Sequence, residues 1–187
     1  ILLLGMSPLP FENDRKVYGT GIRTWQFLKP LLENGQDICV CDFAIPSAYP
    51  KNFRSQHQKN FRHGKYSFTY NILSQNDFES IKLLKEIAED FSPDCMIGCT
   101  FYPSYIAARL IQNFKPIPFW ADLFGHVMAE AQARANIDGD DSCLFHYWNS
   151  EYNIITEADI FSCVSSRQEY ALIGELGAAG RLNRHSS

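Results

Sequence analysis

Residues 78–98 read FESIKLLKEIAEDFSPDCMIG, a stretch that joins a helical pattern directly to a short apolar run. Its first part carries an apolar residue every three or four positions, the spacing of one face of an amphipathic helix: Phe78, Ile81, Leu84, Ile87 and Phe91. Asn76 with Glu79 is the predicted capping pair, and Ser92-Pro93 ends the helix because proline disfavours a helical residue before it. The run Asp94–Gly98 then predicts a buried strand.

Short apolar runs of this kind recur along the whole chain and are separated by segments of helical period. The runs are Ile1–Gly5, Asp37–Asp42, Tyr66–Tyr70, Asp94–Gly98, Ile117–Ala121 and Asp159–Val164. Strands that alternate with helices form a parallel sheet covered by helices on both faces. The sequence therefore predicts an α/β fold, a doubly wound, Rossmann-like parallel sheet of about six strands, with residues 1–187 in a single domain.

The overall composition excludes several classes of protein. Hydrophobic residues make up 45% and charged residues 20% of the chain, as in ordinary globular domains. The formal net charge of -4 argues against a nucleic-acid partner, and no apolar run approaches the roughly 20 residues of a membrane-spanning helix. Six cysteines without a C-x-x-C pair are interpreted as reduced core residues, which argues against zinc and favours the cytoplasm.

In a doubly wound sheet, ligands bind outside the carboxyl ends of the strands. The first segment at this edge is 6–21, which ends in Gly19-Thr20-Gly21 just before a helical pattern begins. The glycines let a ligand approach the backbone, and the helix N-terminus offers free N–H groups to a phosphate. We predict that Gly19, Thr20, Gly21 and Arg23 bind substrate, the alternative being a glycine turn before a helix. The segment is not G-x-G-x-x-G, so no dinucleotide cofactor is expected.

The second segment is 122–130, which follows the strand residues Pro118–Ala121. Asp122 stands at the strand end, where a carboxylate can act as a base or hold a sugar hydroxyl. Its local alternative is the N-cap of the following helix, a position that Asp serves well. His126 and Glu130 follow at intervals of four, so the three side chains could share one face. We predict catalytic roles for Asp122 and His126 and substrate binding for Glu130.

Two further segments carry candidate functions. Residues 99–103 follow another strand, and Tyr102 is predicted to offer an aromatic platform to a sugar ring or lipid, with ordinary loop packing as the alternative. Residues 51–65 contain five Lys or Arg, two His and no acid, with Phe53 and Phe61 between them. A solvated mobile loop is the simpler interpretation, and a peripheral contact with an anionic membrane is the second.

Taken together, these segments resemble the N-terminal domain of the family 4 retaining glycosyltransferases, which have the GT-B fold. The resemblance covers nearly the whole chain and rests on the order of five pieces: the loop with Gly19 and Gly21, Leu32–Ile38, Ser92-Pro93-Asp94, Pro118–Asp122 and Ala158–Ser165. It implies an acceptor-side domain, with the nucleotide sugar bound mainly by a second domain that this sequence does not contain. The E-x7-E donor motif of that second domain is not found here.

The resemblance also implies roles for single residues. Asp122 stands at the position of the family's acceptor-side catalytic residue, which is often His in relatives, and no metal is implied. The expected partners are a nucleotide sugar and a glycan or lipid-linked acceptor. The polar segment 180–187 closes no predicted element, which agrees with a chain that is part of a longer protein. The alternative from another class is a non-catalytic Rossmann-like or flavodoxin-like module that binds a phosphorylated small molecule.

Overall fold

The computed structural model describes residues 1–12 and 14–183. Within them, seven strands form one sheet in the order β3-β4-β2-β1-β5-β6-β7. The strands are β1 (Leu2–Ser7), β2 (Cys39–Ala44), β3 (Gln56–His63), β4 (Tyr66–Leu73), β5 (Met96–Cys99), β6 (Phe119–Asp122) and β7 (Ile160–Ser162). All neighbouring strands are parallel except β3 and β4, which pair antiparallel at one edge.

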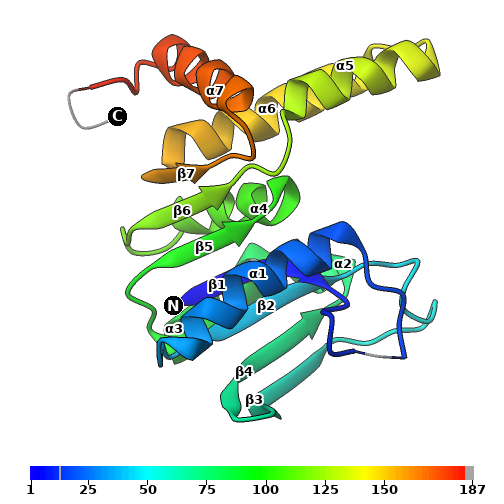
Figure 1. Cartoon of the computed structure of the whole chain (residues 1–187), viewed down its shortest axis with the longest axis vertical. Helices are drawn as coiled ribbons and strands as arrows, with labels where there is room; N and C mark the ends of the chain where they lie inside the picture. The colour runs from blue at the N-terminus through cyan, green and yellow to red at the C-terminus, as the bar shows by residue number, and fades with distance from the viewer. Residues whose placement is uncertain (13, 184–187) are drawn as a thin grey trace.

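Helices connect the parallel strands and cover both faces of the sheet (Figure 1). They are α1 (Gly19–Glu33), α2 (Gln75–Phe78), α3 (Ile81–Phe91), α4 (Phe101–Ile111), α5 (Val127–Asp138), α6 (Ser142–Glu157) and α7 (Ser166–Ala178). Successive side chains of β1 point to opposite faces, so Leu2 and Leu4 join one hydrophobic core and Leu3 joins the other. The predicted doubly wound α/β fold is therefore confirmed.

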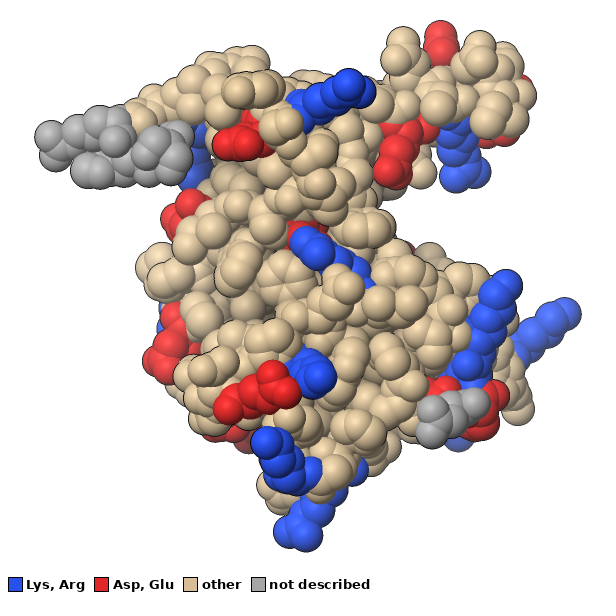
Figure 2. Space-filling view, in the orientation of Figure 1, with Lys and Arg blue, Asp and Glu red and all other residues tan. Residues whose placement is uncertain are grey.

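The strand order reverses between β1 and β5, because the chain first builds β2 and β4 on one side of β1 and then β5, β6 and β7 on the other. A crevice at the carboxyl ends of such a pair is where open α/β sheets bind ligands. Figure 2 shows a hollow at this edge, between the projecting α5–α6 hairpin and the segment that joins β1 to α1. The fold and the sequence therefore both indicate the carboxyl edge of the sheet as the expected ligand site.

The interpretation of residues 51–65 as a loop is wrong for 56–63, which form the edge strand β3. The strand reads QHQKNFRH, and most of it is exposed, so it lacks the apolar alternation by which half-buried strands are recognised. Its one large apolar residue, Phe61, packs against Phe68 and Tyr70 of the neighbouring strand. Charged residues are common on edge strands because they discourage pairing with other chains.

Two helix starts also differ from the prediction. The segment predicted as one helix from Phe78 is divided into α2 and α3, and each begins with its own serine cap. Ser74 accepts a hydrogen bond from the backbone N–H of Asp77, and Ser80 accepts one from Leu83. The predicted capping pair Asn76 and Glu79 is therefore wrong. Residues 99–103 are not a loop either, since α4 begins at Phe101.

All six cysteines lie in the described part of the chain and are free thiols, and Cys39, Cys41 and Cys99 are buried in the sheet. These three therefore act as small core residues, as predicted. Within residues 1–12 and 14–183, no helix combines the length and the hydrophobicity that crossing a membrane requires. Of the polar segment 180–187, the last four residues lie outside the described residues.

Candidate functional site

The carboxyl ends of β1 and β5 form the centre of the candidate site. Directly after β5, Thr100 has a φ of 72°, a left-handed backbone conformation that a β-branched residue rarely adopts. Its hydroxyl lies 3.7 Å from the sulfur of Met6, near the end of β1. Non-glycine residues held in this conformation are concentrated at functional sites, where the surrounding structure supports the strain. The backbone thus marks the point where the strand order reverses.

The N-terminus of α1 lies at this same edge (Figure 1). The N-cap residue Tyr18 makes no side-chain capping bond, and the first turn contains no acidic residue. The first N–H groups of a helix have no partner inside the helix, and the helix dipole places positive charge there. This end of α1 can therefore accept an anion such as a phosphate.

The two predicted glycines of α1 have different roles. A methyl group on Gly21 would lie 2.1 Å from the carbonyl oxygen of Pro8, so this glycine is needed where α1 packs on the loop after β1. A methyl group on Gly19 would meet nothing within 4 Å, and Gly19 is exposed. Of Gly19, Thr20 and Gly21, only Gly19 and the partly exposed Thr20 are therefore open to a ligand. All three lie inside α1, so Gly21 is a packing position of the helix, and the alternative of a glycine turn before the helix is wrong.

Asp122 forms the centre of a buried polar network. Nε of Arg23 donates to Oδ2 at 2.9 Å, and Nη2 donates to Oδ1 at 2.7 Å. The hydroxyl of Ser162 donates to Oδ1 at 2.7 Å and in turn accepts a hydrogen bond from the indole N–H of Trp120. The side chain of Asp122 is 0% exposed and that of Arg23 is 20% exposed. The carboxylate raises the pKa of the Arg23 guanidinium, chiefly through the hydrogen bonds between them.

This network decides between the two local interpretations of Asp122. The residue ends β6 and does not cap α5, because His126 is the N-cap and accepts the backbone N–H of Ala129 at 3.3 Å. The helix-capping alternative is therefore wrong. The carboxylate is also closed to solvent, so its direct effect is to orient Arg23, whose guanidinium reaches the surface between the rings of Phe27 and Phe124.

The other predicted site residues do not join Asp122. Nε2 of His126 lies 3.2 Å from a carboxylate oxygen of Glu175 on α7. Glu130 folds back over Gly125, where a methyl group would lie 2.2 Å from its Oε1. The hydroxyl of Tyr102 donates to Glu79 at 2.7 Å. The structure thus brings Arg23 and Asp122 together and distributes His126, Glu130 and Tyr102 among other contacts.

A second buried aspartate was not singled out in the sequence. Asp42 on β2 is fully buried, and neither of its carboxylate oxygens has a hydrogen-bond partner among the described residues. It lies beside Gly5 of β1, where a methyl group would come within 2.5 Å of Oδ1. Burial, and then the negative charge of Glu12, raise the pKa of Asp42 well above its usual range. The available signal was an acidic residue inside an otherwise apolar run.

Glu12, in the loop after β1, lies close to this aspartate. It accepts hydrogen bonds from the hydroxyls of Tyr49 and Tyr70 at 2.8 and 2.9 Å and from the backbone N–H of Leu9 at 2.9 Å. These bonds come from three separate segments, so Glu12 fixes the loop against β4 and the segment after β2. The part of this loop around Glu12 is thus held in place by partly buried polar contacts.

Comparison with known proteins adds no family assignment. No protein-family model matches the chain, and no curated protein matches it at a significant level.

Proposed function

We propose that this chain is the acceptor-side, Rossmann-like domain of a cytoplasmic GT-B glycosyltransferase, which transfers a sugar from a nucleotide sugar to a glycan, lipid or other hydroxyl acceptor. In this proposal a second domain supplies most of the nucleotide-sugar site, and the present domain contributes the carboxyl edge of its sheet. The fold is consistent with one half of a GT-B enzyme. The resemblance of the sequence to family 4 glycosyltransferases is what suggests the acceptor-side half.

The observation that carries the proposal is the uncapped N-terminus of α1 beside Arg23 at the point where the strand order reverses. Exposed Gly19 and partly exposed Thr20 give a phosphate access to the backbone N–H groups. Arg23 lies one turn further along α1 and adds a cation. A helix N-terminus with an arginine is a suitable arrangement for the diphosphate of a sugar donor.

Asp122 supports this arrangement as a positioning residue. It binds Nε and one N–H of Nη2, and Gln26 accepts from Nη1 at 3.4 Å. Of the five N–H donors of an arginine, two then have no partner among the described residues and can bind a ligand. The fixed geometry matters because a preorganised donor needs no rearrangement when charge develops on a leaving phosphate.

The runner-up is a binding module without catalysis, and one observation favours it. The strand-end carboxylate that the resemblance assigns to catalysis is 0% exposed and fully engaged by Arg23 and Ser162. A domain that only binds a phosphorylated molecule needs the arginine and the helix N-terminus but no open carboxylate. The two functions therefore share a binding site and differ in turnover.

A peripheral membrane contact remains a proposal for residues 51–65. Lys59, Arg62 and Lys65 are exposed on the β3–β4 hairpin, and Figure 2 shows basic side chains gathered at that end of the molecule. Lys59 forms an ion pair with Asp90, so it is less available to bind an anionic lipid. Flotation with liposomes that contain anionic lipid tests the contact, since binding that does not depend on the lipid charge would remove it.

Transfer assays on the protein encoded by the complete reading frame test the main proposal. Arg23→Lys keeps the charge opposite Asp122 but loses the planar fork, so we expect a stable protein with transfer reduced at least tenfold. Arg134→Lys is the matched control, because Arg134 is an exposed residue of α5 whose partners are Asp138 and Tyr147. Binding of nucleotide sugars without any transfer would favour the binding module.

A further inference from the structure

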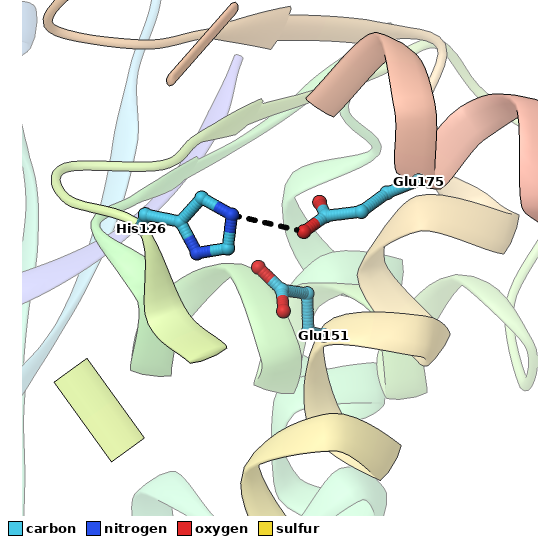
Figure 3. A group of neighbouring side chains, drawn as sticks. All are labelled: His126, Glu151 and Glu175. Atoms are coloured by element: carbon cyan, nitrogen blue, oxygen red, sulfur yellow. Dashed lines mark ion pairs between the residues drawn. The ribbon is translucent and has the colours of Figure 1, made fainter. Parts of the chain in front are cut away.

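A second group of polar side chains gathers away from Arg23 and Asp122. His126 comes from the start of α5, Glu151 from α6 and Glu175 from α7, and the three side chains point toward one another (Figure 3). Their nitrogen and oxygen ligand atoms all lie within 4.8 Å of one another. No Lys or Arg of the described residues forms an ion pair with either glutamate.

Glu151 is the unusual member of this group. It is 5% exposed, and its carboxylate has no hydrogen-bond or ion-pair partner among the described residues. Buried carboxylates are normally hydrogen-bonded or paired, because removing one from water without a partner is costly. Its carboxylate points toward His126 and Glu175 (Figure 3), and the ligand atoms of the three side chains lie within 4.8 Å of one another, so one cationic group could contact both carboxylates.

A pocket of about 220 Å³ opens onto the two glutamates. Trp148 and Tyr152 line it with stacked rings, whose centroids lie 5.4 Å apart, and Met128 and Ile155 add apolar surface. The volume is below that of pockets for drug-sized ligands, so the pocket suits a small molecule. Aromatic rings of this kind can hold the apolar body of a ligand while the neighbouring carboxylates accept hydrogen bonds from its cationic group.

The hydrogen bonds of His126 decide between a metal ion and an organic cation. Nδ1 accepts the backbone N–H of Ala129, so the ring proton lies on Nε2 and points to Glu175. A metal ion at Nε2 would need the lone pair of that nitrogen and would break the cap of α5. Within the part of the chain that the structure describes, two carboxylates would otherwise be its only protein ligands, fewer than a zinc site uses. An ammonium group needs only the two carboxylates, to which it donates.

We infer that the pocket between α5, α6 and α7 binds a small primary amine, whose ammonium group is held by Glu151 and Glu175 and whose apolar body lies against Trp148 and Tyr152. The site lies outside the Arg23 network and does not depend on the proposed transferase function. His126 holds Glu175 in place through its Nε2 proton.

Isothermal titration with phenethylamine at pH 7.5 tests this site, and phenethyl alcohol serves as the uncharged ligand of the same shape. We expect saturable binding of the amine and at least tenfold weaker binding of the alcohol. Burial, and then the charge of Glu175, raise the pKa of Glu151 to about 8, so the ammonium group must draw this side chain into its charged form. Glu151→Gln should weaken amine binding at least tenfold, because the amide keeps the shape but has no charged form. Glu169→Gln, at an exposed position of α7, is the matched control and should bind within twofold of the unmodified chain.

Three results would overturn the inference: equal binding of amine and alcohol, unchanged amine binding by Glu151→Gln, or binding of Zn²⁺ by a chain that does not bind the amine. Should Glu151→Gln fail to fold, Trp148→Ala changes a side chain that is 48% exposed and tests the aromatic wall. We expect this variant to bind the amine at least threefold more weakly. Unchanged binding by Trp148→Ala would likewise exclude the pocket.

Discussion

Asp122 and Asp42 occupy similar positions in the sheet but have opposite surroundings. Both are 0% exposed, and they lie in the carboxyl-terminal halves of β6 and β2. Asp122 receives hydrogen bonds from Arg23 and Ser162, whereas neither oxygen of Asp42 has a partner among the described residues. Burial alone therefore does not decide whether a carboxylate is charged. The partners decide it, and they also decide what each residue can do.

The difference separates two kinds of contribution. Asp122 is a charged group that holds an arginine at the edge where a ligand is expected. Burial raises the pKa of Asp42, so the folded chain favours the protonated form of this residue. The stability of the chain therefore depends on pH through Asp42. The place of an aspartate in a strand therefore does not reveal its role, which depends on its hydrogen-bond partners.

Removing the carboxylate of Asp122 should have the largest effect. Asp122→Ala leaves the Arg23 guanidinium partly buried without its charge partner, and breaking such a pair costs about 3–5 kcal/mol in unfolding free energy. Urea denaturation measures this loss. In Arg23→Met with Asp122→Leu, much of the loss should be recovered, because no unpaired charge remains. Equal stability of Asp122→Ala and the unmodified chain would show that the pair is not formed.

Asp122→Asn also tests the pairing of Asp122 with Arg23. If Asp122 capped α5, this substitution would be nearly silent, because Asn caps about as well as Asp. Since the carboxylate instead binds Arg23, the amide should weaken both the fold and the orientation of the arginine. Stability and transfer should therefore fall together, and a loss of transfer in a fully stable Asp122→Asn protein would instead support a direct catalytic role.

A smaller effect is expected from the hydroxyl that supports Asp122. Ser162→Ala removes one hydrogen bond to a charged acceptor, which is worth about 1.5–3 kcal/mol. It also leaves the indole N–H of Trp120 without its acceptor. Thermal unfolding at several pH values measures the effect. A change of less than about 0.5 kcal/mol would mean that water or another group replaces the hydroxyl.

Asp42 should stabilise the folded chain at low pH and lose this effect as the pH rises. The folded chain holds the Asp42 proton to a higher pH than the unfolded chain, in which an aspartate has a pKa of about 3.9. Its contribution to stability is therefore complete below about pH 3.9 and is lost as the pH rises through the folded pKa. Between those values the loss is about 1.4 kcal/mol per pH unit.

Asp42→Asn replaces the titrating carboxyl group by an amide that does not titrate. The variant is therefore expected to be more stable than the unmodified chain at pH 8. The difference between the two proteins should shrink as the pH falls toward 4. Chemical denaturation at pH 4, 6 and 8 gives the comparison. Parallel stability curves for the two proteins would show that Asp42 is paired or hydrated in the folded chain.

The sequence predicted the fold because its signals are local. Apolar runs and helical spacing predict the parallel strands and their connecting helices, although the same spacing predicts one helix where the structure has α2 and α3. Strand β3 was missed because its residues are almost all polar and exposed, and its pairing depends on the neighbouring β4. A polar edge strand carries little pattern of its own, and tertiary contact decides it.

The candidate site was predictable only in part. Asp122, Arg23 and the glycines could be selected because strand ends and helix starts are visible in the sequence. The bidentate pair itself could not, since Arg23 and Asp122 are 99 residues apart. The grouping of Asp122, His126 and Glu130 assumed a helix that began at Asp122, but α5 begins at Val127. That shift changes the direction of each side chain.

An NMR titration of the chain with uridine diphosphate tests most directly whether the carboxyl edge binds a phosphorylated ligand. We expect saturable shifts at the amides of Gly19 and Thr20 and at the Nε–H of Arg23, with at least tenfold weaker binding by Arg23→Lys. Gly19→Ala should stay folded, because its added methyl group meets nothing within 4 Å. Shifts that are absent, or that gather on β3 while those amides stay unchanged, would contradict a phosphate site at α1.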